Sequence, residues 1–162
     1  MPNSKILIAY FTHSGNTKVA TQKIQNLIGG DIFEIKPIKS YSEDYYQVVE
    51  IAKEEKRKNV RPELLHHLES IDNYVIVILG YPNWWGTMPM VVFTFLERHD
   101  FSGKIIAPVC THEGSVMGKS ESDIKRLCPH SKVLKGLAIR GGSVHNADKD
   151  ITEWLHAIGI LN

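Results

Sequence analysis

The chain alternates short apolar runs with longer amphipathic segments. Two of the apolar runs, KILIAYF near the start and YVIVILGY in the middle, are hydrophobic almost throughout instead of at every second position. Such continuous apolar character is typical of parallel strands that are covered on both faces. The pattern predicts five strands, over residues 5–11, 31–36, 74–81, 104–110 and 132–140.

The segments between these strands carry apolar residues at helical spacing. In residues 43–58, Tyr45, Val48, Val49 and Ala52 fall at positions i, i+3, i+4 and i+7, which places them on one face of a helix. Pro89 is a favourable first residue for another helix. The pattern predicts five helices, over residues 17–28, 43–58, from 89 onward, 120–127 and 148–158.

Alternating strands and helices in one chain predict an α/β fold with a parallel sheet and right-handed crossovers. Five strands in a chain of 162 residues favour the doubly wound order 2-1-3-4-5, with helices on both faces. No repeat, linker or low-complexity tract interrupts the pattern, so we expect a single domain over residues 1–162. In this topology ligands bind beyond the carboxyl ends of the strands, between the first and the third.

The loop after the first strand has the composition of an anion site. Three of its side chains are hydroxyl donors, and its glycine allows backbone N–H groups to turn toward the N-terminus of the next helix. A helix N-cap is the alternative, for which a single hydroxyl would suffice. The loop lacks the Walker A and dinucleotide-binding patterns. Its residues are Thr12, His13, Ser14, Gly15, Asn16 and Thr17.

The loop after the third strand contains two adjacent tryptophans in a polar, turn-forming segment. Neighbouring side chains usually diverge, so we expect one ring to pack inward and the other to face the crevice, where a planar aromatic ligand could stack on it. The sequence leaves open which ring does which. The predicted binding residues are Pro82, Asn83, Trp84, Trp85 and Gly86.

The loop after the fourth strand is polar and contains a glycine, which suits hydrogen bonds to the edge of a heteroaromatic ring. Any surface loop can have this composition, so the prediction depends on the loop's place at the binding edge. Its residues are Thr111, His112, Glu113, Gly114 and Ser115. Cys110, at the strand end, is expected to be a small buried hydrophobic residue and not a reactive thiol.

In these loops the chain resembles the flavodoxin-like proteins, in the short branch whose loops have the patterns T-x-S-G-N-T and P-x-W-W-G-T-x-P. The resemblance extends over nearly the whole chain. It implies a flavodoxin-like fold and FMN bound non-covalently. The phosphate would lie in the loop 12–17, and the isoalloxazine ring between the loops 82–86 and 111–115. The last of these lacks the tyrosine with which many flavodoxins cover the outer flavin face, which leaves Trp84 or Trp85 as the stacking partner.

Composition and charge exclude several other classes of protein. Nineteen basic and eighteen acidic residues leave a formal charge of +1, so the chain has no overall attraction for nucleic acid or an anionic membrane. No apolar run is long enough to span a bilayer, and residues 1–11 lack the features of a signal peptide. Two cysteines do not make a disulfide scaffold, so a cytoplasmic protein is expected. The basic stretch KEEKRKNVR, residues 53–61, is interpreted as a solvated helix end.

Motifs of other catalytic classes are missing. No acidic pair follows the first strand, which argues against a phosphoacceptor domain, and no G-x-S-x-G motif indicates a serine hydrolase. The eight histidines include no i, i+4 pair, so no metal site is expected. His13 and His112 are the histidines whose positions allow a cofactor contact.

Two function classes remain for a protein of this kind. One is a low-potential electron carrier between redox partner proteins, which the small size and the absence of a second domain favour. The alternative is an NAD(P)H-dependent quinone or flavin reductase, which an open flavin face and the near-neutral charge favour. A module that holds FMN without redox activity is a distant third.

Overall fold

Six strand segments form one parallel sheet in the computed structural model, which describes residues 5–162. Their order is β2-β1-β3-β4-β5, with β6 also paired to β4. This confirms the predicted α/β, doubly wound fold. Residues 1–4, on which the expected absence of a signal peptide partly rests, lie outside the described part. The strands are β1 (Ile6–Tyr10), β2 (Asp31–Glu34), β3 (Ile76–Pro82), β4 (Ile105–His112), β5 (Lys132–Val133) and β6 (Leu137–Arg140).

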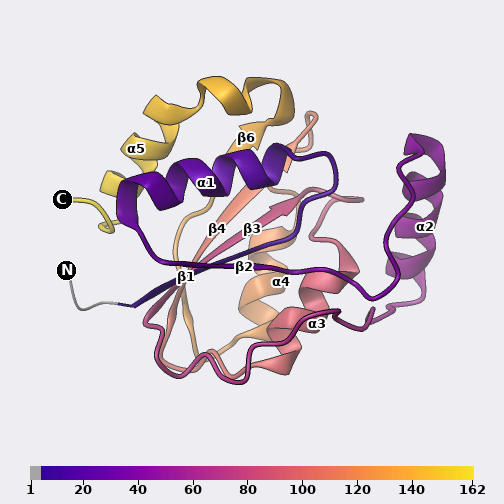
Figure 1. Cartoon of the computed structure of the whole chain (residues 1–162), viewed down its shortest axis with the longest axis horizontal. Helices are drawn as coiled ribbons and strands as arrows, with labels where there is room; N and C mark the ends of the chain where they lie inside the picture. Colours follow the sequence, from indigo (N-terminus) through magenta and orange to yellow (C-terminus); the bar gives the residue numbers. More distant parts are fainter. Residues whose placement is uncertain (1–4) are drawn as a thin grey trace.

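Helices cover both faces of the sheet, and one helix stands apart at its end (Figure 1). Helices α1 (Asn16–Ile28) and α5 (Asp148–Ala157) lie on one face, and α3 (Met90–Arg98) and α4 (Ser120–Leu127) lie on the other. Helix α2 (Tyr45–Arg57) lies beyond the carboxyl end of the sheet, and the short 3₁₀ helix η1 (Gly141–Asn146) connects β6 to α5. Within residues 5–162, no helix is both long and apolar enough to cross a membrane.

The two faces of the sheet explain why the first and third strands are apolar throughout. Ile8 and Ile78 are fully buried on the side of α1 and α5, whereas Leu7 and Val77 are buried on the side of α3 and α4. Alternate residues of each strand therefore enter different hydrophobic cores. Neither face of β1 or β3 tolerates polar side chains, because both faces are covered.

The last strand is broken in two, so the single predicted strand over residues 132–140 is wrong. Ile106 pairs with Val133 and Val109 pairs with Leu137, so two residues of β4 lie opposite three residues of the other strand. Pro108 lies within this gap and has no N–H to donate to the ladder. The extra residue forms a bulge between β5 and β6.

Helix α1 packs very close to β3, and this contact positions the first loop of the site. Gly80 allows the approach, because a Cβ there would come within 2.8 Å of the Thr21 methyl carbon and 3.2 Å of the Thr17 methyl carbon. The N-terminus of α1 is thereby held beside the carboxyl ends of β3 and β4.

Candidate functional site

A cleft of about 540 Å³ opens at the carboxyl end of the sheet, where the topology predicts a ligand site. Most of the residues predicted from the sequence line it, namely His13, Ser14, Asn16, Pro82, Asn83, Trp84, Trp85, Gly86, Thr111, His112, Glu113 and Ser115. The structure thus brings all three predicted loops together around one space. Thr12, Gly15, Thr17 and Gly114 belong to these loops but do not line the cleft.

Helix α2 contributes a wall of the cleft that the sequence did not indicate. Tyr45, Val48, Val49 and Ala52 line it, together with Gly141 from η1. The helical spacing of the four α2 residues marked them as an apolar face, and only Val48 and Ala52 are buried. Periodicity identifies an apolar face but not what covers it, so this part of the site was missed.

The first loop presents some of its polar groups to the cleft and uses others internally. The Thr12 hydroxyl accepts hydrogen bonds from the backbone N–H groups of Gly15 at 3.1 Å and Lys18 at 3.4 Å. The buried Thr17 hydroxyl lies 2.8 Å from the Thr111 hydroxyl. Ser14 is exposed at the cleft, and within residues 5–162 its backbone N–H and that of Thr17 donate no hydrogen bond to protein. The loop therefore retains donors at the start of α1.

The two adjacent tryptophans have different environments. Trp84 packs edge-on against three rings, with centroid distances of 5.3 Å to Phe11, 5.8 Å to His13 and 5.0 Å to Tyr41. Trp85 is 44% exposed. Its indole Nε1 donates to the Val49 carbonyl of α2 at 3.0 Å. Trp84 is therefore the inward ring of the pair, although both line the cleft.

Lysines of α2 contact the tryptophan loop, which we define as residues 82–87. Lys53 Nζ lies 5.6 Å from the centre of the Trp85 ring, and Lys56 Nζ donates to the Trp85 carbonyl. Farther along the same basic stretch, Arg57 pairs with Glu54 at 2.9 Å. The interpretation of residues 53–61 as a solvated helix end therefore misses the two lysines that contact the loop.

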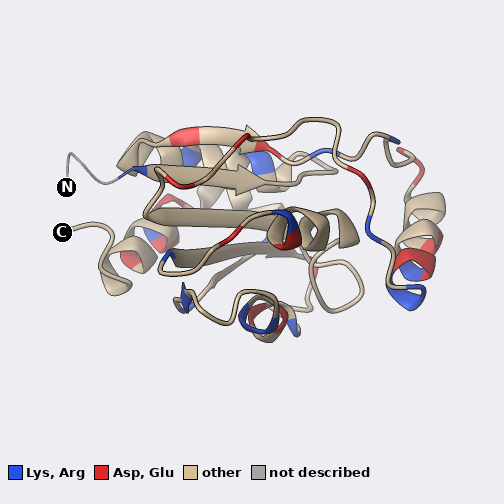
Figure 2. Ribbon diagram, turned by 90° about the horizontal axis from the view of Figure 1, so that it is seen from below, with Lys and Arg blue, Asp and Glu red and all other residues tan. Residues whose placement is uncertain are grey.

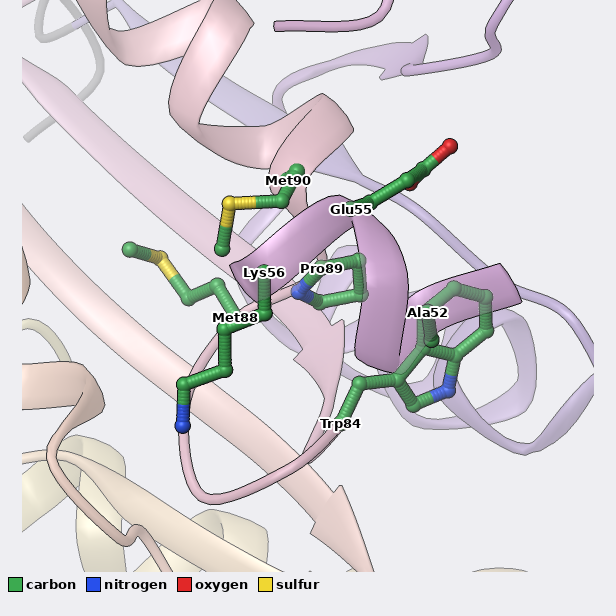
Figure 3. Close-up of a pocket in the computed structure, with 7 residues that line it drawn as sticks. All are labelled: Ala52, Glu55, Lys56, Trp84, Met88, Pro89 and Met90. Atoms are coloured by element: carbon green, nitrogen blue, oxygen red, sulfur yellow. The ribbon is translucent and has the colours of Figure 1, made fainter. Parts of the chain in front are cut away.

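Behind Trp84 lies a narrow crevice between α2 and the start of α3, shown in Figure 3. It has no space for a water molecule, so it is a packing seam and not a ligand site. Lys56 lines this crevice and not the large cleft. The other residues that line it are Ala52, Glu55, Trp84, Met88, Pro89 and Met90.

A partly buried hydrogen bond also connects α2 to the aromatic cluster around Trp84. The Tyr41 hydroxyl donates to Glu55 Oε1 at 2.6 Å. Burial raises the pKa of the Glu55 carboxyl, and burial together with this carboxylate raises the pKa of Tyr41 well above its usual range. Tyr41 thus remains a hydrogen-bond donor at neutral pH and holds α2 against the tryptophan loop.

The third loop places a neutral imidazole at the cleft. The Gly114 backbone N–H donates to His112 Nδ1 at 2.9 Å, which leaves the proton of the neutral ring on Nε2. Burial and the nearby Arg140 lower the pKa of His112. Arg140 also donates to the Glu113 carbonyl at 3.2 Å and so braces the loop. His112 is thus positioned as a donor from Nε2.

Cys110 lies near the end of β4, beside the third loop of the site. Cys110 is buried as expected, and burial raises the pKa of its thiol to about 12, so it is not a nucleophile at neutral pH. Throughout residues 5–162, no group of three His, Cys, Asp or Glu side chains could hold a metal ion. The cleft therefore offers hydroxyl, amide, imidazole and aromatic groups.

Comparison with known proteins places this geometry among flavoproteins. The sequence profile of the flavodoxin family matches residues 5–158. No curated protein sequence matches the chain. A solved structure from Bacteroides eggerthii, named provisionally as a flavoprotein, has 32% sequence identity and a TM-score of 0.84, over 96% of this chain and 98% of that one.

Two further solved structures show the same fold. A protein from Bacteroides uniformis, also named provisionally as a flavoprotein, has 27% identity and a TM-score of 0.81, over 95% of this chain and 99% of that one. A flavoprotein from Lactobacillus acidophilus, solved in complex with FMN, has 23% identity and a TM-score of 0.68, over 88% of this chain and 97% of that one.

Proposed function

The chain belongs to the flavodoxin family, and from this premise we propose that it binds FMN in the cleft and carries electrons between redox partner proteins of the cytoplasm. The observation that supports the proposal most strongly is the convergence of three loops on one cleft between β1 and β3. FMN is also the ligand of the structurally similar protein from Lactobacillus acidophilus.

The first loop fits the phosphate of FMN. Ser14 and Asn16 line the cleft, and the N–H groups of Ser14 and Thr17 make no hydrogen bond within residues 5–162. An anion at the start of a helix satisfies such donors and interacts favourably with the helix dipole. The hydroxyls of Thr12 and Thr17 support the loop from within, since both are already hydrogen-bonded.

The remaining walls fit a flat aromatic ring. Trp84 and Trp85 line one side of the cleft, and the loop with His112 lines another. Tyr45 of α2, which is 70% exposed, is available to cover the face that the third loop leaves open. When bound there, FMN would supply a group that accepts and returns electrons together with protons.

A reductase is the second candidate, and two observations favour it. The α2 wall, formed by Tyr45, Val48 and Val49, gives the cleft a partly apolar side that a second aromatic molecule could use. Helix α2 carries acidic and basic residues close together along its ribbon (Figure 2), so it lacks the strongly acidic character of many flavodoxins. A reductase would accept both electrons together from NAD(P)H.

Reductive titration of the FMN-loaded protein distinguishes the two functions. A carrier transfers single electrons, so we expect reduction in two separate one-electron steps and negligible steady-state oxidation of NAD(P)H in the presence of quinones. The absorbance spectrum follows the titration, and NADH or NADPH consumption follows turnover. A single two-electron step with rapid NAD(P)H oxidation would show that the protein is a reductase.

A further inference from the structure

The peptide between Trp85 and Gly86 is held from both sides. Its N–H, which belongs to Gly86, donates to Asn83 Oδ1 at 2.9 Å, and its carbonyl, which belongs to Trp85, accepts a hydrogen bond from Lys56 Nζ. Asn83 is itself fixed, because its Nδ2 donates to the Val116 carbonyl at 3.0 Å. The orientation of this peptide is therefore set by two different parts of the chain.

The backbone around this peptide is strained. The N–H of Trp84 donates to the Thr87 carbonyl at 2.9 Å, which closes a two-residue turn with φ of 56° at Trp85 and 83° at Gly86. Turns with two positive φ values favour asparagine and glycine, and a bulky residue stays in this conformation only where its surroundings impose it. The contacts from α2 to Trp85 supply that restraint.

The Lys56 contact directs the Trp85 carbonyl toward a side chain that does not line the cleft. Lys56 belongs to the crevice behind Trp84 and does not line the cleft, and in Figure 3 its side chain descends from α2 to the loop. A flavin ring nitrogen that takes up a proton with an electron becomes a hydrogen-bond donor and needs an acceptor. The Trp85 carbonyl is the acceptor that this loop could offer, provided that the peptide rotates.

Such rotation requires more than the conformational freedom of Gly86. Turning a peptide over changes ψ of the residue before it and φ of the residue after it, so Trp85 must move as well as Gly86. Both hydrogen bonds of the peptide must also break, and the bond from Lys56 is charge-assisted and hence the stronger kind. Lys56 therefore opposes the rotation directly.

We propose that Lys56 is a positioning residue that holds the Trp85 carbonyl outside the cleft and thereby limits the separation of the two one-electron steps of bound FMN. The inference rests on the proposed function, because it concerns FMN in the same cleft. Lys56 does not line the cleft, but it controls the orientation of the Trp85–Gly86 peptide, whose residues do.

Lys56→Met tests the proposal, with Lys53→Met as the matched control. Methionine retains the length and helix propensity of lysine but not the ammonium group. Both variants lose one positive charge from the same helix, and both lysines contact Trp85, but only Lys56 contacts its carbonyl. Any difference between the variants therefore reports the carbonyl contact and not the charge.

Two measurements are made on the full chain. Without FMN, hydrogen exchange of the Gly86 amide is expected to be about tenfold faster in Lys56→Met than in Lys53→Met, because the peptide leaves Asn83 more often. With FMN bound, potentiometric titration is expected to show the two one-electron potentials farther apart in Lys56→Met. Lys56→Arg, which retains a charged donor, is expected to restore the wild-type values.

The role of Lys56 would be overturned if the two methionine variants had equal exchange rates at the Gly86 amide and equal separations between the two one-electron potentials. The proposed carrier function would fail in a different way, by a single two-electron step in the wild-type protein. In that case the exchange rate of Gly86 without FMN still decides whether Lys56 holds the peptide. The two failures are therefore distinguishable.

Discussion

Gly118→Ala is expected to weaken FMN binding about tenfold or more and to lower the free energy of unfolding by about 1–3 kcal/mol. Gly118 has φ of 55°, and a Cβ there would lie 2.2 Å from the carbonyl oxygen of Gly86 and 2.7 Å from its carbonyl carbon. These are backbone atoms, and the N–H of Lys119 fixes them further by donating to the Gly86 carbonyl at 2.7 Å. The tryptophan loop would have to move. Fluorescence titration with FMN and urea denaturation measure the two effects.

Gly142→Ala is the matched control for this substitution. Gly142 follows Gly141, which lines the cleft, but a Cβ on Gly142 would meet no atom of the described residues within 4 Å, and its φ is not in the left-handed region. Its affinity for FMN and its stability should equal those of the wild-type protein. If Gly118→Ala behaved like this control, the close contact between residues 118 and 86 would not support the site.

Trp84→Ala is expected to lower the free energy of unfolding of the FMN-free protein by about 3 kcal/mol. This is near the lower end of the range of losses caused by replacing a buried aromatic residue with alanine. The ring is partly buried and contacts Phe11, His13 and Tyr41, which come from segments far apart in the sequence. Its removal leaves a cavity between the first loop and α2 that these neighbours cannot fill. Urea denaturation measures the change as a lower midpoint at an unchanged slope.

Trp85→Ala provides the comparison within the same dipeptide. Trp85 is 44% exposed, and its indole makes one hydrogen bond, to the Val49 carbonyl. Its replacement should cost no more than about 1 kcal/mol of unfolding free energy, the usual net contribution of a single hydrogen bond. Equal losses in the two variants would contradict the assignment of Trp84 as the inward ring.

Much of the fold could be predicted because local patterns determine it. Four helices begin and end within two residues of their predicted limits, and α3, for which only the start was predicted, begins one residue after it. The apolar character of β1 and β3 follows from the cores that cover both their faces. The break between β5 and β6 was not predicted. It occurs where Pro108 of β4 lies opposite the chain, and local patterns do not give the register between two strands that are distant in sequence.

The site was predictable only where its residues follow strands in the sequence. The three loops at the carboxyl ends of β1, β3 and β4 meet at the cleft, as the topology requires. The requirement for glycine at position 118 comes from Gly86, more than thirty residues away, and no local pattern reports it. Lys56 contacts the Trp85 carbonyl, but it lies in a stretch whose composition is that of an ordinary solvated helix end, so the sequence did not indicate this contact.

Competition among flavins tests the central claim most directly. The flavin-free protein is mixed with equal concentrations of FMN, FAD and riboflavin, freed of unbound ligand, and denatured, and the released flavin is identified by chromatography. The N–H groups of Ser14 and Thr17 have no acceptor within residues 5–162, which fits a first loop that holds a terminal phosphate. In that case FMN will be recovered in a one-to-one ratio with the protein, with little FAD or riboflavin. Recovery of FAD as the main product, of FMN and riboflavin in equal amounts, or of no flavin would contradict the account.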